Sequence, residues 1–186
     1  TAPHWPWETR DDAAKVADIS HNLFHLDGGN VATYQRMIHH MDEGIGQVLA
    51  ALAARGVLAN TLVIFTSDNG GAGYIGLPEI NKPYRGWKST FFEGGIHAPF
   101  FMRWPGHVPA DSIQNGIFSG LDWLPTFVAA AGNPNITEEL LKGKEIGGRV
   151  YKNHLDGYNQ MDAITGKGPS ARHEIFYLGE STVGAV

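Results

Sequence analysis

The sequence predicts an α/β fold in which a mainly parallel sheet is flanked by helices. Apolar residues recur at three- and four-residue steps between residues 34 and 52, which is typical of one helix face. A near-continuous apolar run follows at residues 62–66, and a second run, APFFMRW, occupies residues 98–104. Because uninterrupted apolar runs are typical of strands buried on both faces, the alternation of helix and strand favours a parallel sheet.

The first helix is expected to begin after Asn30, a residue type that caps helix N-termini. Gly56 is the residue type that commonly follows a helix C-terminus. Between these two positions, the apolar face is predicted to consist of Tyr34, Ile38, Met41, Ile45, Val48, Leu49 and Leu52.

A short helix is predicted over residues 122–131, with Pro125 in its first turn and Gly132 closing it. Residues 133–171 are expected to be mostly loop, and IFYL at 175–178 a strand of another sheet. Glycine pairs predict tight backbone turns; they lie at residues 28–29, 70–71, 94–95 and 147–148.

Composition excludes several classes of function. A net charge of −5 gives no basic footprint for nucleic acid, and no apolar run is long enough to cross a membrane. The absence of cysteine excludes disulfides, thiolate metal sites and a cysteine nucleophile. Because the first residues have neither an initiator Met nor a signal-peptide pattern, we expect a fragment. The compartment stays open between periplasm, exterior, lysosome and cytoplasm.

An acid–amide pair, Asp68 and Asn69, follows directly after the predicted strand at 62–66. In open α/β sheets, ligands bind outside the carboxyl ends of the strands. A carboxylate and a carboxamide oxygen are hard ligands of the kind that Ca²⁺ or Mg²⁺ prefers. The alternative interpretation is ordinary turn chemistry, in which Asp-Asn-Gly-Gly side chains bond their own backbone.

Lys88 lies in a glycine-rich loop that leads into the second strand, where its compact charge suits an anionic substrate. Glu93, before Gly94 and Gly95, is expected to fix the loop by accepting backbone N–H bonds. His4, in APHWPWE, is a proton donor suited to neutral pH. The alternatives are a solvated lysine and an ordinary histidine, and no H-E-x-x-H metal motif occurs.

Taken in order, several runs resemble the sulfatase family of the alkaline-phosphatase-like superfamily. They are YQRMIHHMDEGIGQVLAAL, NTLVIFTSDNGG, GWKSTFFEGGIHAPFFMRWPG and SGLDWLPTFVAAAG, followed by HLDGYNQ and RHEIFYLGE near the small C-terminal domain. The resemblance implies that residues 1–132 are the later part of the catalytic α/β domain. It also implies that residues 133–186 are connecting loops and the beginning of the C-terminal α+β subdomain.

The resemblance implies an arylsulfatase-like hydrolase of sulfuric esters. Asp68 and Asn69 match two ligands of the family's divalent cation, usually Ca²⁺, which also holds the sulfate. Lys88 matches the lysine that contacts sulfate oxygens and the leaving oxygen. His4 matches a histidine near the bridging oxygen, a candidate general acid. Lys88 and His4 are therefore the expected catalytic and substrate-binding residues, and the expected partner is a small-molecule sulfate ester.

Two features depart from the family pattern. The family nucleophile, a formylglycine made from the first residue of Cys/Ser-x-Pro-x-Arg, has no match, because Ser170-Ala171-Arg172 has the wrong spacing. The family's Asp-Asp metal ligands are absent too, and His97 stands where an arginine is common. We therefore expect the isolated chain to be inactive, to bind Ca²⁺ weakly and to self-associate through exposed sheet edges.

Two other interpretations remain open at this point. A phosphonate or phosphate ester hydrolase of the same superfamily is one, although such sites commonly place histidine where this chain has Asn69. A non-catalytic pseudo-sulfatase acting as a binding module is the other. Aryl, carbohydrate and choline sulfates are all compatible with the sequence.

Overall fold

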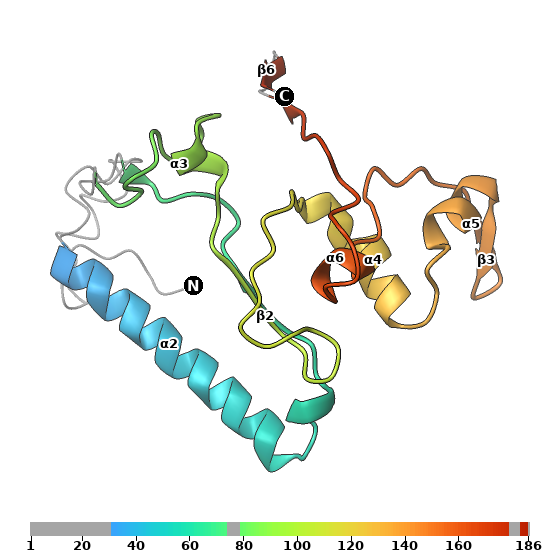
Figure 1. The fold of residues 1–186 in the computed structure, drawn as a ribbon, viewed down its shortest axis with the longest axis horizontal. Helices are drawn as coiled ribbons and strands as arrows, with labels where there is room; N and C mark the ends of the chain where they lie inside the picture. The colour runs from blue at the N-terminus through green and yellow to red at the C-terminus, as the bar shows by residue number, and fades with distance from the viewer. Residues whose placement is uncertain (1–30, 74–78, 179–182, 186) are drawn as a thin grey trace, which may run out of the picture. The chain divides into compact units, whose positions relative to one another are not determined.

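The computed structural model describes residues 31–73, 79–178 and 183–185 (Figure 1). The chain divides into two compact units, residues 1–102 and residues 103–186. Each unit is described by itself. The domain boundary predicted between residues 132 and 133 stays a prediction. It was inferred from the domains of the sulfatase family, whereas the two units are defined by contacts within this chain.

The predicted long helix is confirmed as α2, which spans Val31–Ala54. Gly56 follows the helix end, and its positive φ of 69° suits glycine. The Gly56 N–H donates to the Ala53 carbonyl (2.9 Å) and the Val57 N–H to the Leu52 carbonyl (3.1 Å). This pair of bonds is the Schellman arrangement, which satisfies carbonyls left over at a helix end. The predicted cap, Asn30, lies outside the described residues.

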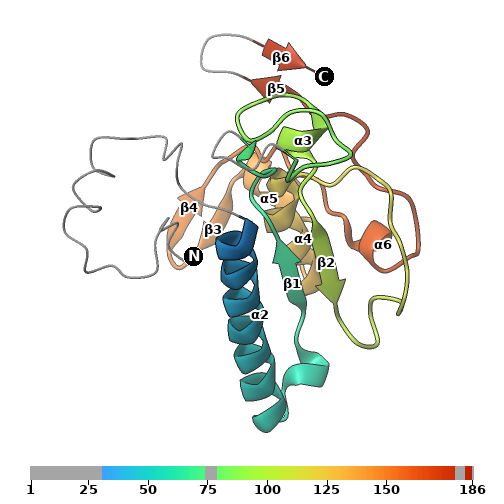
Figure 2. The ribbon, with the colours of Figure 1, turned by 90° about the vertical axis from the view of Figure 1, so that its left-hand side faces the viewer.

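Both predicted strands of the first unit are present, as β1 (Val63–Thr66) and β2 (Phe100–Arg103), and they form a two-stranded sheet. A 3₁₀ turn, η1 (Leu58–Asn60), precedes β1, and a short helix, α3 (Glu93–Ile96), precedes β2. Figure 2 shows β1 and β2 side by side. Their residues are half-buried or exposed rather than buried on both faces.

The mainly parallel sheet that the sequence predicted is not formed within the described residues. The Ser67 N–H donates to the Pro99 carbonyl (3.3 Å), so the chain enters β2 beside the point where it leaves β1. The two sheets whose register is defined, β3–β4 and β5–β6, are antiparallel. A parallel pair needs a crossover that returns the chain to the far end of the sheet. Hydrogen bonds instead fold the β1–β2 connection back along itself.

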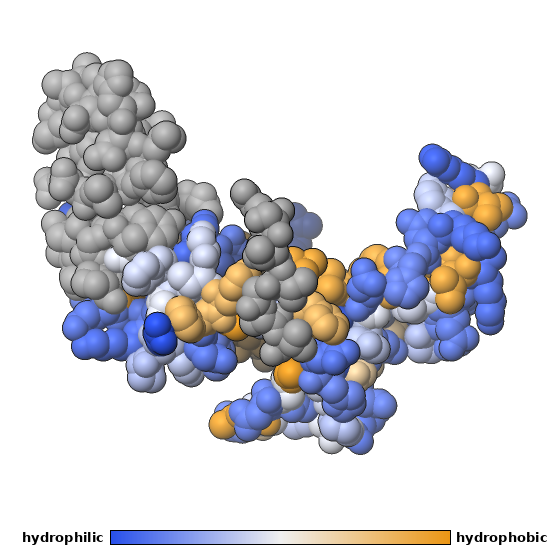
Figure 3. All heavy atoms as spheres, turned by 90° about the horizontal axis from the view of Figure 1, so that it is seen from above, coloured by the Kyte–Doolittle hydropathy of each residue, from blue (hydrophilic) through white to orange (hydrophobic). Residues whose placement is uncertain are grey.

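The apolar face of α2 lies open. Ile38, Met41 and Val48 keep 42%, 41% and 60% of their surface exposed. An open groove of about 770 Å³ separates this face from Phe65 of β1 and Phe101 of β2. Hydrophobic residues also reach the surface in the space-filling view (Figure 3). The expected self-association stays a prediction, although unburied apolar area of this kind supports it. Among the described helices, none has the length and apolar character that crossing a membrane requires.

The second unit begins with the predicted short helix, observed as η3 (Gly120–Asp122) running into α4 (Trp123–Ala130). Residues 133–171 contain more regular structure than the loop that the sequence predicted. Their elements are α5 (Ile136–Lys142), β3 (Lys144–Ile146), β4 (Arg149–Tyr151) and α6 (Met161–Ile164). Most of the segment still lies outside these elements, as predicted, but the sequence did not indicate the elements themselves, because elements of three to seven residues are too short to show a hydrophobic period.

Two sequence signals in this unit are confirmed. Gly147 and Gly148 have φ of 60° and 79° and join β3 to β4, as a two-residue hairpin turn requires. The predicted strand at residues 175–178 is observed as β5 (Tyr177–Leu178). It pairs with β6 (Val183–Ala185) in a sheet of its own.

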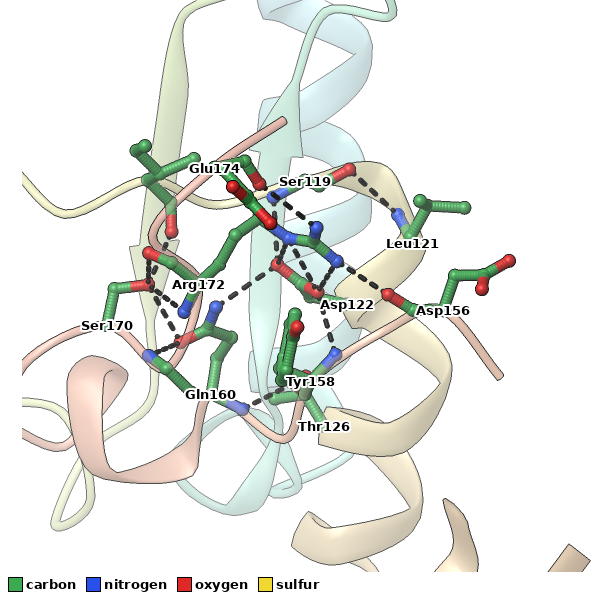
Figure 4. Close-up of polar contacts among 12 residues, drawn as sticks. Ser119, Leu121, Asp122, Thr126, Asp156, Tyr158, Gln160, Ser170, Arg172 and Glu174 are labelled. Carbon is green, nitrogen blue, oxygen red and sulfur yellow. Dashed lines mark hydrogen bonds and ion pairs between the residues drawn. The ribbon is translucent and has the colours of Figure 1, made fainter. Parts of the chain in front are cut away.

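A buried ion pair joins the start of α4 to the segment before β5. Asp122 is fully buried and Arg172 keeps 8% of its surface exposed. The guanidinium donates from Nε to Asp122 Oδ2 (3.0 Å) and from Nη2 to Asp122 Oδ1 (2.7 Å). Figure 4 shows the two groups facing each other. The Nη2 group also donates to the carbonyl of Asp156 (2.8 Å), so the pair fastens three separate segments.

The other acceptor positions of the Asp122 carboxylate also receive hydrogen bonds. The backbone N–H groups of Tyr158 (2.8 Å) and Ser119 (3.0 Å) and the Gln160 side chain (3.1 Å) all donate to Asp122. Burial alone would raise the pKa of Asp122, but the bonds from Arg172, Tyr158, Ser119 and Gln160 together hold that pKa below its usual value. The carboxylate is therefore charged and satisfied in the folded protein.

We expect Asp122→Asn to destabilise the chain by about 3–5 kcal/mol, because it leaves the Arg172 charge buried without its partner. The free energy of unfolding from urea titration checks this. The matched control is Asp111→Asn: Asp111 is exposed and its φ of 54° suits asparagine, so little change is expected. Equal stability of Asp122→Asn and wild type would contradict this role of the ion pair.

The same pair makes stability depend on pH. Because the pKa of Asp122 is lower in the folded protein than in the unfolded chain, its stabilisation is present above the unfolded pKa. The stabilisation is lost as pH falls through the folded pKa. The stability difference between wild type and Asp122→Asn should therefore narrow between pH 7 and pH 3 in urea titrations. A difference that stays constant over this range would argue against the assignment.

Candidate active site

The end of β1 delivers the predicted acid–amide pair to the surface. Asp68 is exposed, and its carboxylate has no hydrogen-bond partner among the described residues. Asn69 is half-buried, and its Nδ2 donates to the Gly70 carbonyl (2.7 Å). The Ser67 hydroxyl donates to the Asn69 carbonyl (2.8 Å) and holds the turn. The turn therefore presents the carboxylate oxygens of Asp68 and the amide oxygen of Asn69, to which no described residue donates.

The glycine-rich loop between β1 and β2 is closed by backbone hydrogen bonds. The Gly70 N–H donates to the Gly95 carbonyl (2.9 Å), and the Gly94 N–H donates to the Arg85 carbonyl (2.8 Å). A Cβ on Gly70 would lie 1.8 Å from the Gly94 carbonyl oxygen, and a Cβ on Gly94 would lie 2.3 Å from the Gly86 oxygen. Glycine is thus required because the backbones touch, not because the turn is tight.

Lys88 is anchored to the same turn through its backbone. Its N–H donates to the carbonyl of Gly71 (3.1 Å), two residues after Asn69, while its side chain is exposed. Thr90 fixes the preceding residue, since its hydroxyl donates to the Trp87 carbonyl (2.7 Å) and accepts from the Trp87 N–H (3.2 Å). The structure therefore brings Lys88 into one hydrogen-bonded loop with Asp68 and Asn69.

Glu93 does not act as the sequence predicted. Its carboxylate bonds the His97 ring, with Oε2 3.0 Å from Nδ1, and no described backbone N–H donates to it. Glu93 is the first residue of α3, so its side chain meets the residue four positions later rather than the loop backbone. Both side chains are more than half exposed. The loop is held instead by Asn81, which no sequence pattern singles out because asparagine is an ordinary loop residue.

The donor set fits a hard cation only in part. Asp68 and Asn69 would supply two oxygens, whereas Ca²⁺ takes about six to eight. No cluster of three or more histidine, aspartate or glutamate side chains that suits a metal occurs within residues 31–73, 79–178 and 183–185. His4, the candidate general acid, lies outside the described residues.

Comparison with known proteins identifies related chains. The Sulfatase family model matches residues 1–133. Human arylsulfatase A is 33% identical over 147 residues, which cover 74% of this chain and 24% of that protein. Human N-acetylgalactosamine-6-sulfatase is 40% identical over 113 residues, which cover 59% of this chain and 22% of that protein. The chain thus spans about a quarter of the length of these relatives.

Solved structures are similar as well. The crystal structure of Ps i-CgsB in complex with k-i-k-neocarrahexaose has a TM-score of 0.62 and 31% identity. The match covers 91% of this chain and 33% of the chain in that structure. The structure of the PsFucS1 sulfatase from Pseudoalteromonas sp. has a TM-score of 0.57 and 27% identity. This match covers 75% of this chain and 26% of the chain in that structure.

Replacing Gly70 by alanine should open the loop, because the new Cβ would meet the Gly94 backbone oxygen at 1.8 Å. We expect a cost of about 1–3 kcal/mol, typical of overpacking, and faster hydrogen exchange over residues 84–97. The control is Gly46→Ala in α2, where nothing lies within 4 Å of the new Cβ. Unchanged exchange in Gly70→Ala would show that the two arms of the loop are not in contact.

Proposed function

Because the chain belongs to the sulfatase family, we propose that it contributes the later half of the active site of a sulfuric ester hydrolase. In this proposal residues 1–132 belong to the catalytic domain and residues 133–186 to the connecting loops and the start of the C-terminal subdomain. The match of the family model over residues 1–133 supports the first part. Because the chain covers only about a quarter of its curated relatives, the activity is proposed for a protein that also carries a nucleophile.

One observation carries the proposal. The Lys88 N–H is bonded to Gly71, so the lysine and the Asp68-Asn69 pair belong to one turn-and-loop assembly. A sulfate ester carries negative charge on its oxygens, and an exposed lysine in the same loop assembly as an exposed carboxylate and a half-buried amide suits binding of that group together with a cation. A loop lysine without such an anchor would indicate only a solvated surface.

The roles of the residues follow from their chemistry. Asp68 and Asn69 would hold Ca²⁺, which when bound polarises the sulfuryl oxygens. The Lys88 ammonium binds the sulfate oxygens and stabilises charge that builds on them and on the leaving oxygen. His4 donates a proton to the departing alkoxide or phenoxide, as general acid catalysis requires.

The nucleophile is the part that these 186 residues do not contain. There is no cysteine, and none of the serines begins Ser-x-Pro-x-Arg. We therefore propose that a separate segment would supply the nucleophile, a hydroxyl of hydrated formylglycine, while the residues of this chain bind and orient the ester. The isolated chain then has sulfate-binding groups but nothing to accept the sulfuryl group.

In the whole protein, Lys88→Ala should lower kcat/KM for 4-nitrophenyl sulfate about 10²- to 10³-fold, the effect typical of removing one group that stabilises transition-state charge. Steady-state kinetics measure the change. The matched control is Lys82→Ala, because Lys82 lies in the same loop and its exposed ammonium pairs with the exposed Glu79 carboxylate (2.6 Å). Its kcat/KM should stay near that of wild type.

Two outcomes would overturn the proposal. One is wild-type kcat/KM in Lys88→Ala, which would make the lysine a surface residue. The other is preferred hydrolysis of a phenylphosphonate monoester over the sulfate ester in the wild-type protein, which would favour the phosphonate hydrolase interpretation.

A further inference from the structure

The Asn81 side chain sits at a junction of the loop between β1 and β2. Its Oδ1 accepts from the Gly71 N–H (2.8 Å), and its Nδ2 donates to the Gly71 carbonyl (2.8 Å) and to the Gly86 carbonyl (3.1 Å). A carboxamide has two N–H donors, and both are used here. The side chain thus pairs with Gly71 as a strand backbone would, and reaches a second segment with its remaining donor.

Gly71 is the residue on which these bonds converge. Its carbonyl accepts from the Asn81 side chain, from the Lys88 N–H (3.1 Å) and from the Gly73 N–H (3.1 Å), so its acceptor capacity is filled. A Cβ at position 71 would lie 2.7 Å from Asn81 Oδ1 and 2.9 Å from Ile80. The close approach shows that the carboxamide is packed against this backbone rather than hanging in solvent.

The two segments that Asn81 joins are those that carry the proposed chemistry. Gly71 lies two residues after Asn69, and Gly86 lies two residues before Lys88. A single planar group with three short hydrogen bonds therefore fixes the spacing between the cation-binding turn and the lysine. Between the described residues 67–73 and 84–88, the other direct hydrogen bond runs from the Lys88 N–H to the Gly71 carbonyl.

We propose that Asn81 is a positioning residue of the active site, which sets the place of Lys88 relative to Asp68 and Asn69 without touching the substrate. The inference rests on the proposed function. A displacement of about 1 Å in a positioned group can cost on the order of 10²-fold in rate. Loss of the carboxamide should thus lower activity by moving Lys88, while the fold of the rest of the chain persists.

The first test is a double-mutant cycle in the whole protein. Asn81→Ala should lower kcat/KM for 4-nitrophenyl sulfate about 10- to 100-fold, as a small displacement of a catalytic group does. In the Lys88→Ala background the same change should have little further effect, because the group that it positions is already gone. An equal fold-loss in both backgrounds, or no loss in either, would overturn the proposal.

A second variant distinguishes loss of the Asn81 hydrogen bonds from a general loss of folding. Asn81→Asp keeps an oxygen that accepts from the Gly71 N–H, but it replaces the donating amide group by an oxygen that faces the Gly71 and Gly86 carbonyls. Only the protonated carboxyl can donate there, and it restores one of the two hydrogen bonds. Its activity relative to wild type should therefore rise as pH falls toward the pKa of the new acid. A ratio that is independent of pH would contradict the hydrogen-bonding role. Asn60→Ala, at an exposed position of η1, is the matched control and should behave as wild type.

Hydrogen exchange separates this inference from the proposed function. In Asn81→Ala the Lys88 amide should exchange about tenfold faster, which corresponds to about 1.4 kcal/mol. This readout does not depend on catalysis. If the wild-type protein hydrolyses no sulfate ester while Lys88 exchange still rises, the proposed function fails and the bridging role of Asn81 stands. Unchanged exchange at Lys88 would overturn the inference itself.

Discussion

The contact between the two arms of the β1–β2 loop is the constraint on which the candidate site depends. Gly70 and Gly95 share a backbone hydrogen bond of 2.9 Å, and no Cβ fits at Gly70 or Gly94. This approach allows the Asn81 carboxamide to span the arms and the Lys88 N–H to reach Gly71. Asp68 is left exposed at the mouth of the turn. The chemistry thus follows from a backbone packing arrangement that only glycine permits.

In the second unit, the central interaction is a buried ion pair rather than a backbone contact at a turn. The buried Asp122–Arg172 pair accompanies a small apolar core, whose buried hydrophobic members among the described residues are Ile136, Leu140, Ala163 and Ile164. A buried ion pair contributes little net stability compared with apolar packing, but losing one partner is costly. The pair therefore acts chiefly as a specific fastening between α4 and the segment before β5. The open face of α2 shows the complementary situation, in which apolar surface has no described partner.

Much of the regular structure could be predicted from sequence, for identifiable reasons. The long apolar period of α2 and the positive φ at Gly56 reflect local rules, and both are confirmed. The sheet prediction failed because pairing direction depends on contacts between distant residues such as Ser67 and Pro99. Asp68, Asn69 and Lys88 were found through motif spacing, and their roles stay predictions. Asn81 carried no signal, because its importance comes from what its carboxamide reaches in space.

We propose that these residues bind and orient a sulfate ester but cannot accept the sulfuryl group. The most direct test is release of 4-nitrophenol from 4-nitrophenyl sulfate by the 186-residue chain with added Ca²⁺. We expect no release above that of buffer, since no residue of the chain matches the nucleophile motif. Hydrolysis that persists through purification and disappears in Lys88→Ala would contradict it. Such a result would mean that another group of this chain attacks the sulfur.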